Sequence, residues 1–332
     1  MNLYADLLRP ILFRLDAEKA HHLALTLLEK TPLSLVQNLL FARASATPKT
    51  VFGVQFSNPV GLAAGMDKNA LALPAWEALG FGFIEIGTIT AHAQPGNPTP
   101  RLFRYPRQNA LINRMGFNND GAETVALRLQ ALKDSGRWPH IPVGVNLGKS
   151  KITELADAPA DYVASFRRLL PYGDYFVINV SSPNTPGLRS LQDRGALTTI
   201  IRTLRDADAS KPLLVKIAPD LEEPAALEIA ELATSEKLSG LITTNTTLDH
   251  SSVPQDQDQQ GGLSGAPLRE KSTAMLRLIV GNTNLPIIAS GGVMDAQSAK
   301  EKFDAGAALV QIYTGFVYRG PQLIREIASL NL

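Results

Sequence analysis

The chain of 332 residues contains no cysteine. This absence excludes disulfide bonds, thiolate zinc sites, iron–sulfur clusters and a cysteine that acts as nucleophile or base. Histidine is also scarce, since there are five and only His21 and His22 are adjacent. We therefore expect no metal site, and any redox chemistry needs a cofactor.

The sequence also lacks a strong charge of either sign and a long apolar run. Its formal net charge is +1 and it has no dense basic tract, so we expect no nucleic-acid partner. No run reaches the roughly 18 apolar residues of a membrane span, and the N-terminus has no secretory signal. With 45% hydrophobic and 19% charged residues, the composition is that of a soluble globular protein, and the cytoplasm is the default location.

From Val60 onward, short apolar runs alternate with helical patterns. Strands are predicted at Val60–Ala64, Gly82–Gly87, Pro142–Leu147, Tyr175–Ser181, Leu213–Ala218, Gly240–Thr244, Pro286–Ser290 and Ala308–Tyr313. Helices are predicted at Leu71–Leu79, Gly121–Leu132, Pro159–Leu170, Gly195–Ala207, Pro224–Ser235, Pro267–Val280, Ala296–Asp304 and Gln322–Leu330. Eight strand–helix units predict a (β/α)8 TIM barrel over residues 49–332, with a doubly wound sheet as the weaker alternative.

Residues 1–48 differ from the rest and are predicted to form an amphipathic helical segment before the barrel. Apolar residues recur at helical spacing from Leu3 to Leu15, and again from Ala20 to Leu28 after the cap-like Asp16. Further apolar residues follow between Leu33 and Phe41. Burial of a large aliphatic side chain is worth roughly 1.5–3 kcal/mol, so we expect either the barrel or a membrane surface to cover them.

Two connections are longer than barrel closure requires. They run from Thr90 to Asn119 and from Thr246 to Leu268, and the second contains a Gly-Gly-Leu-Ser-Gly sequence. Long loops on a rigid scaffold are usually lids or flexible surface.

Small polar residues follow the fourth predicted strand, between Asp174 and Arg189. Asparagines also stand at or near the ends of other strands or in adjacent loops: Asn113, Asn146, Asn179, Asn184 and Asn245. Ligands bind at the carboxyl ends of the strands in this fold class, and an amide offers both a donor and an acceptor. These amides are therefore suited to read a heterocycle with alternating donors and acceptors.

Two glycine-containing turns and two lysines point to an anionic ligand. The seventh strand ends in Ser290-Gly-Gly-Val293 and the eighth in Tyr313-Thr-Gly315, and barrels frequently bind phosphate at these two turns. Lys68 follows the first strand, and Lys216 lies inside an apolar strand. A buried lysine needs a partner, so we expect Lys216 to lie under an anionic ligand.

Several motifs together resemble the class 2, quinone-dependent dihydroorotate dehydrogenases, from about His21 to the C-terminus. The resemblance rests on Asn58–Lys68, Glu85–Thr88, Pro95–Pro98, Pro100–Arg104, Ile112–Asn118, Asn179–Arg189, Lys216–Asp220, Thr244–Thr247, Gly261–Gly265 and Gln311–Tyr313. It implies oxidation of (S)-dihydroorotate to orotate in pyrimidine (UMP) biosynthesis, with one FMN per subunit as hydride acceptor and a membrane quinone as final acceptor. Class 1 members use a cysteine base, which this chain lacks.

The resemblance also implies roles for individual residues. Ser182 is the expected base, with Thr185 a candidate member of a proton relay. The expected substrate-binding residues are Lys68, Asn113, Arg114, Met115, Gly116, Phe117, Asn179, Asn184, Asn245 and Thr246. The expected FMN-binding residues are Ala64, Gly65, Met66, Asp67, Lys68, Thr88, Asn146, Asn179, Lys216, Thr244, Gly265, Gly292, Tyr313 and Thr314.

The quinone is expected to meet His21, Arg104 and Tyr313, with residues 1–48 forming its tunnel at the membrane surface. The targeting and membrane-spanning segment of the mitochondrial members is absent, which indicates a peripheral protein on the cytoplasmic face of the cell inner membrane. The sequence departs from many members at Ala289-Ser290, before the retained Gly291-Gly292, and Met66 stands at a variable position.

Two other functions stay open. One is a phosphate-binding barrel aldolase or lyase in which Lys216 forms a Schiff base. The other is a non-catalytic barrel whose N-terminal helices bind a membrane or a partner protein, although such a protein needs no lysines and asparagines at strand ends.

Overall fold

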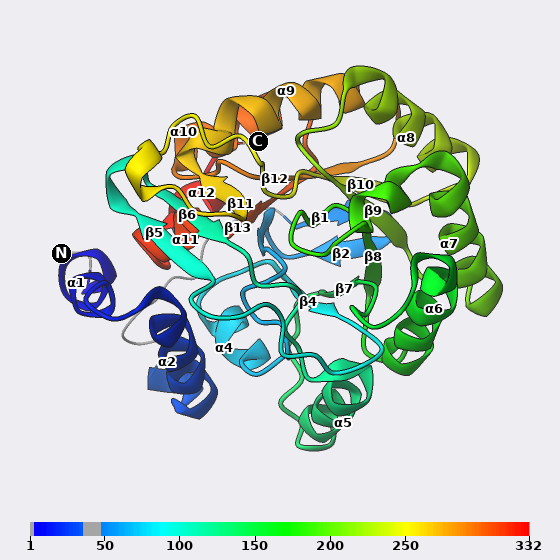
Figure 1. The fold of residues 1–332 in the computed structure, drawn as a ribbon. Coiled ribbons are helices and arrows are strands. Elements are labelled where there is room, and N and C mark those ends of the chain that lie inside the picture. Colours follow the sequence, from blue (N-terminus) through cyan, green and yellow to red (C-terminus); the bar gives the residue numbers. More distant parts are fainter. Residues whose placement is uncertain (1–2, 36–47, 332) are drawn as a thin grey trace.

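A closed barrel of eight parallel strands forms the centre of the computed structural model, which describes residues 3–35 and 48–331 (Figure 1). The strands are β3 (Val60–Leu62), β4 (Phe83–Ile89), β7 (Val143–Leu147), β8 (Tyr175–Asn179), β9 (Leu213–Ile217), β10 (Gly240–Thr243), β12 (Ile287–Ser290) and β13 (Leu309–Ile312). Each predicted strand is present. The last strand pairs with the first, Val310 opposite Val60, so the TIM barrel is confirmed and the open doubly wound sheet is wrong.

Helices surround the barrel, as Figure 1 shows. The eight predicted helices are α4 (Leu73–Ala78), α5 (Gly121–Asp134), α6 (Ala158–Leu169), α7 (Arg194–Ala207), α8 (Glu223–Ser235), α9 (Arg269–Val280), α10 (Ala296–Asp304) and α12 (Gln322–Ala328). Their apolar stripes face the strands: in α7, Leu197, Ile200, Ile201 and Leu204 are buried. One further helix, α11 (Thr314–Arg319), follows β13 directly and was not predicted.

A β-hairpin fills the amino end of the barrel. Its strands β1 (Lys49–Val51) and β2 (Val54–Phe56) pair antiparallel. Phe56 is buried with its ring edge-on to Phe83, at 5.1 Å between centroids, and Phe52 packs on Tyr175 at 5.5 Å. These aromatic rings close this end, which leaves the carboxyl end for ligands.

The two long connections meet over the carboxyl end. They contribute β5 (Leu102–Tyr105), β6 (Ala110–Asn113) and β11 (Gly262–Gly265) to a three-stranded antiparallel sheet in the order β11-β6-β5. Gly262 lies opposite Asn113, far away in the sequence. Part of each connection is therefore ordered by pairing with the other, and no strand was predicted in either. Short 3-10 helices complete the connections: η2 (Pro106–Gln108), η3 (Leu155–Asp157), η4 (Leu188–Gln192), η5 (Gln255–Gln257) and η6 (Ala266–Leu268).

Two short helical stretches precede the barrel. The first is a π-helical turn, η1 (Tyr4–Leu8), that continues into α1 (Arg9–Leu12), and the second is α2 (Ala17–Lys30). Asp16 caps α2 as predicted, because its carboxylate accepts hydrogen bonds from the backbone of Glu18 and Lys19 at 3.0 Å each. The predicted helical segment from 36 to 47 lies outside the described residues.

The first stretch is fixed to α11. The Tyr4 hydroxyl donates to the backbone oxygen of Val317 at 2.6 Å, and Arg9 donates to that of Tyr318 at 2.8 Å. Among the helices described, none is both long enough and apolar enough to cross a bilayer.

Candidate active site

A cavity opens at the carboxyl end of the barrel, beneath the β5-β6-β11 sheet. It has about 1050 Å³ of empty space, a volume that includes its opening to solvent. The sequence-predicted residues that line it are Ala64, Gly65, Lys68, Thr88, Asn113, Met115, Gly116, Phe117, Asn179, Ser182, Asn184, Lys216, Thr244, Asn245, Thr246, Gly265, Gly292, Tyr313 and Thr314. The fold thus brings together residues that lie up to about 250 positions apart in the sequence.

Six expected site residues do not line this cavity: His21, Met66, Asp67, Arg104, Arg114 and Asn146. Met66 is buried in the core. The Asp67 carboxylate accepts hydrogen bonds from the backbone of Leu71 and Ala72 and from the Trp76 indole, at 2.8–3.0 Å. Its side chain therefore braces the start of α4 and faces away from the cavity.

Asn146 lies directly behind the cavity wall. Its side-chain oxygen accepts from Thr88 at 2.6 Å and from Asn179 at 3.0 Å, and its amide nitrogen donates to Glu85 at 2.7 Å. Asn146 therefore orients two lining residues, Thr88 and Asn179.

Asn179 is the centre of a chain of hydrogen bonds along the cavity floor. Its amide nitrogen donates to Thr88 at 2.9 Å, and its oxygen accepts from the Ser181 hydroxyl at 3.1 Å. Asn245 in turn donates to Ser181 at 2.9 Å. The loops after β8 and β10 are tied together by these bonds, and Asn184 donates to Asn113 at 3.2 Å on the other side. The fold therefore brings these asparagines close together, as their positions at or near strand ends had suggested.

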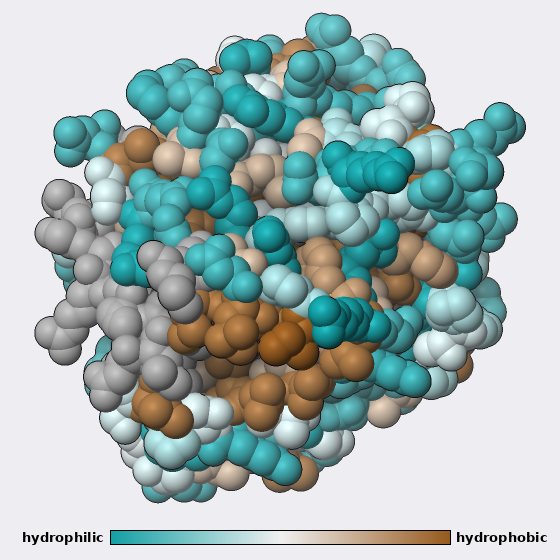
Figure 2. Space-filling view, turned by 90° about the vertical axis from the view of Figure 1, so that its left-hand side faces the viewer, coloured by the Kyte–Doolittle hydropathy of each residue, from teal (hydrophilic) through white to brown (hydrophobic). Residues whose placement is uncertain are grey.

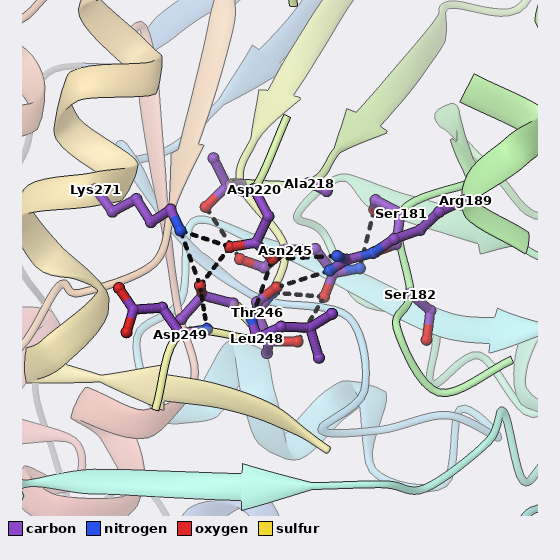
Figure 3. A network of polar contacts seen from close by, with 12 residues as sticks. Ser181, Ser182, Arg189, Ala218, Asp220, Asn245, Thr246, Leu248, Asp249 and Lys271 are labelled. Carbon is purple, nitrogen blue, oxygen red and sulfur yellow. Dashed lines mark hydrogen bonds and ion pairs between the residues drawn. The ribbon is translucent and has the colours of Figure 1, made fainter. Parts of the chain in front are cut away.

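Ser182 is 5% exposed and lines the cavity. Its hydroxyl oxygen accepts a hydrogen bond from the backbone N–H of Asn184 at 3.2 Å, which fixes the side chain. Thr185, the candidate relay member, is buried nearby in the same loop. Figure 3 shows Ser182 beside a network that joins its loop to the loops after β9 and β10.

Lys216 is 5% exposed and faces the cavity from β9. Within the described part of the chain, its ammonium group has no hydrogen-bond or ion-pair partner. Burial lowers its pKa, and the nearby Glu85 carboxylate opposes that effect. The site therefore presents a buried cation that an anionic ligand would pair.

Gln311 provides a second unmet group. Its amide nitrogen donates to the buried Glu85 carboxylate, and the residue contributes to the cavity wall from β13. Its side-chain oxygen has no hydrogen-bond partner among the described residues, but it also has almost no exposed surface, so it lies inside the barrel and does not face a ligand. Gln311 and Glu85 were missed as site residues although the same signal, a polar residue inside an apolar strand, had singled out Lys216.

The glycine-containing turns after β12 and β13 lie next to each other, because these strands are neighbours in the barrel. Both turns line the cavity, as predicted for a phosphate site, and α11 begins at Thr314. Ser264 of β11 lies 2.8 Å from the Thr314 hydroxyl and completes this wall. Five apolar residues also line the cavity but were not predicted as site residues: Leu102, Leu111, Leu268, Val293 and Met294.

The N-terminal helices approach the adjacent part of the cavity wall, near Lys68 and Tyr313. Burial is the main reason that the pKa of His21 is lowered to about 3, and the charges of Lys68 and His22 contribute to this shift. Burial also lowers the pKa of Lys68 to about 8, whereas Glu18 raises it. His21 on α2 thus lies close enough to Lys68 to be affected by its charge, although it does not line the cavity.

Two arginines among the expected residues hold secondary structure in place. Arg104 donates to the backbone oxygens of Leu12 and Leu15, and its guanidinium lies 4.6 Å from the centre of the Phe13 ring. Arg114 donates to the Pro100 backbone oxygen at 2.9 Å. Arg104 therefore connects the N-terminal helices to β5, and Arg114 braces the segment before it.

Comparisons with known proteins agree with this geometry. A family model described as dihydroorotate dehydrogenase matches residues 47–330. A relative from Gloeobacter violaceus, described as dihydroorotate dehydrogenase (quinone), is 51% identical over 336 residues, which cover 99% of this chain and 94% of the relative. One from Salinispora arenicola with the same description is 52% identical and covers 98% of each chain.

A solved structure is also similar throughout. DHODH from Eimeria tenella in complex with ferulenol superposes with a TM-score of 0.86 at 37% identity, over 94% of this chain and 89% of that chain. The similarity therefore includes the barrel and the described helices before it.

Proposed function

Because the chain belongs to the dihydroorotate dehydrogenase family, in its quinone-dependent class, we propose that the carboxyl-end cavity holds FMN and dihydroorotate side by side. The enzyme oxidises dihydroorotate in pyrimidine biosynthesis and uses a quinone as acceptor. The observation that carries the proposal is the buried Lys216 ammonium on the cavity wall, which has no partner among the described residues and shares the cavity with several asparagines.

The cavity residues fit FMN. Lys216 supplies a cation, and the glycine-containing turns after β12 and β13 line the cavity with backbone of the kind that binds phosphate. When bound there, FMN would supply the acceptor for the substrate hydride and the carrier of electrons to the quinone. The expected FMN-binding residues that line the cavity would hold it, with Asn146 supporting them from behind.

We assign the proton acceptor to Ser182. A serine hydroxyl is a weak base, so the proton must pass onward through water or a neighbouring hydroxyl, and Thr185 is a candidate. The hydrogen bond from the Asn184 backbone fixes the Ser182 oxygen toward the cavity. Ser182 would thus remove a proton from the substrate carbon next to the one that loses the hydride.

The substrate would be read by amide side chains. Asn113, Asn179, Asn184 and Asn245 surround one part of the cavity, and a pyrimidine ring alternates donors and acceptors in the way that such amides match. An analogue that left one of these amides unpaired would bind less well, because an unpaired buried polar group costs about 1–3 kcal/mol. Lys68 would add a positive charge near the substrate and the flavin.

We also propose that the quinone reaches the cavity past the N-terminal helices, near His21 and Tyr313. Figure 2 shows apolar side chains gathered on the face where these helices lie. The exposed fractions of Leu7, Ile11 and Leu27 on η1, α1 and α2 are 49%, 55% and 54%. Such a face suits an interfacial helix, and we propose that residues 1–48 bind the cytoplasmic face of the inner membrane peripherally, beside a barrel domain of residues 49–332.

A visible absorption spectrum tests the central proposal. The purified protein should be yellow with bound FMN, and anaerobic dihydroorotate should bleach the flavin absorbance until a quinone restores it. A colourless protein that takes up no FMN would contradict the proposal. Borohydride trapping of Lys216 with a carbonyl substrate would support the aldolase alternative instead.

A further inference from the structure

Arg189 connects three loops at the rim of the cavity (Figure 3). It lies in η4, just after the loop that carries Ser182. Its guanidinium donates to the Ser181 backbone oxygen at 3.1 Å, to the Asp220 carboxylate at 3.1 Å and to the Thr246 backbone oxygen at 3.3 Å. These partners follow β8, β9 and β10 respectively.

Asp220 holds this guanidinium from the loop after β9. Its carboxylate also accepts from the Thr247 hydroxyl, from the Leu248 backbone N–H at 3.0 Å and from Lys271 of α9 at 2.8 Å. Burial alone would raise the pKa of Asp220, but the hydrogen bonds from Lys271, Thr247 and Leu248 keep it below its usual value. The carboxylate is thus a fixed anion between two cations.

Neither Arg189 nor Asp220 lines the cavity. Thr246, whose backbone oxygen accepts from Arg189, does line it, and so does Ser182, which follows Ser181 in the chain. Strands β8 and β10 are not neighbours, because β9 lies between them. No direct strand pairing therefore joins the loops that follow β8 and β10. The Asn245–Ser181 hydrogen bond joins them at the cavity, and Arg189 joins them again outside it, where its planar donors serve both carbonyls and the carboxylate together.

We propose that Arg189, held by Asp220, is a positioning residue for dihydroorotate oxidation. It fixes the loop of Ser182 relative to the loop of Asn245 and Thr246, so that the proton acceptor faces the residues that hold the substrate. The inference rests on the proposed role of Ser182. It assigns no direct contact with substrate or FMN to Arg189 or Asp220.

Arg189→Met tests this inference, because methionine keeps an unbranched apolar stem and removes every donor. We expect reduction of the bound flavin by dihydroorotate to slow at least tenfold in stopped flow, while reoxidation of reduced flavin by quinone stays within twofold of wild type. Arg189→Lys restores the charge beside Asp220 but cannot serve both carbonyls together. Compared with Arg189→Met, this variant should have higher thermal stability but should recover only part of the rate of flavin reduction.

Arg194→Met is a matched control. Arg194 stands five positions further along and pairs with Glu231 at the same 3.1 Å, but on the outer surface of the barrel. It should leave both half-reactions unchanged. Asp220→Asn is a second variant, which keeps the side-chain shape and should also slow flavin reduction. It tests the inference if Arg189→Met does not fold.

Hydrogen exchange supplies a readout that does not depend on turnover. In FMN-loaded protein, peptides from 181 to 193 and from 244 to 248 should exchange faster in Arg189→Met than in wild type, with peptides of α7 unchanged. Equal slowing of both half-reactions, wild-type flavin reduction, or unchanged exchange in both loops would overturn the inference. Flavin reduction at the wild-type rate in Ser182→Ala would instead contradict the proposed role of Ser182. The hydrogen-exchange experiment would still show whether Arg189 holds the two loops together.

Discussion

At the scale of single residues, Ser182 is the clearest test of the proposed chemistry. Ser182→Ala removes the hydroxyl that would take the substrate proton but leaves the cavity wall intact. Flavin reduction by dihydroorotate should fall at least a hundredfold, within the contribution of roughly 10²–10⁴ typical of a general base. Stopped-flow absorbance would measure it, with flavin content as a check that the site is loaded.

Ser190→Ala is a suitable control for that substitution. Ser190 lies in the same loop region but is exposed, and its hydroxyl bonds only to the nearby Gly187 backbone. It should reduce flavin at the wild-type rate. If Ser182→Ala did so too, the base would have to be another group.

Lys216 gives a second prediction at this scale. Lys216→Met removes the buried cation on the cavity wall, so the reduced and more negative flavin should lose stabilisation. We expect a more negative midpoint potential and weaker FMN binding, measured by redox titration and by fluorescence of released flavin. Lys211→Met is the control, because Lys211 donates to the Gly173 backbone outside the cavity. A potential equal to that of wild type would show that Lys216 does not tune the flavin.

Most of the cavity wall was predicted from the family resemblance, whereas residue chemistry alone predicted the two lysines, the asparagines and the glycine-containing turns. Lys216 was predicted to face a ligand because a charged residue interrupts an apolar strand, and the asparagines because they follow strand ends. The sequence could not show that Asp67 turns toward Trp76 or that Arg104 holds backbone carbonyls, since the direction of a side chain depends on neighbours distant in the chain. Glu85 and Gln311 are also polar residues inside apolar strands, but they were not predicted as site residues.

At the scale of elements, the N-terminal helices should act separately from the barrel chemistry. Replacing Leu7 and Leu27 by serine removes apolar surface from η1 and α2, and each large aliphatic side chain is worth roughly 1.5–3 kcal/mol when buried. We expect weaker binding to vesicles and slower turnover with a long-chain quinone, but normal flavin reduction by dihydroorotate.

Leu127→Ser provides the comparison. Leu127 on α5 is 63% exposed, more than either helix residue, but lies away from the N-terminal face. Vesicle flotation should show wild-type binding for it. Equal loss of binding in both variants would mean that general surface hydrophobicity, and not these helices, governs the association.

The elements that were predicted are those with a local signal. Strand–helix alternation and the Asp16 cap depend on residues close in sequence, so they were found. The β5-β6-β11 sheet was missed because its pairing joins two connections about 150 residues apart, and each strand alone is four residues long. The helix α11 was missed because its six residues are too few to show a period.

At the scale of the whole molecule, one buried charge should shape the pH dependence of stability. Lys302 on α10 is fully buried and donates to Ser272 at 2.5 Å and Thr273 at 2.8 Å. Burial lowers its pKa to about 7, with Glu301 opposing and Arg269 and Arg277 adding to the shift. The unfolded chain therefore binds more protons than the folded one between about pH 7 and 10.5, and stability rises with pH across that range.

Lys302→Met should accordingly gain stability relative to wild type near pH 7, and the gain should shrink toward pH 10. Each unit of pKa shift corresponds to about 1.4 kcal/mol, so the difference should be clear in urea unfolding at the two pH values. Lys300→Met, which removes an exposed partner of Asp304, should show no such trend. A constant difference for Lys302→Met would mean that lost packing, not titration, dominates.

Because the amino end of the barrel is closed, ligands can enter only at the carboxyl end. The order of the strands separates the parts of this end that the substrate and the quinone would use. The Ser182 loop follows β8, while the N-terminal helices approach Lys68 after β3 and Tyr313 after β13, on the far side of the ring. A water-borne pyrimidine and a lipid-borne quinone could then arrive from opposite arcs of the same rim without crossing paths. On the proposal that the N-terminal helices bind a membrane, the rim at β3 and β13 would face the bilayer and the rim at β8 would face water.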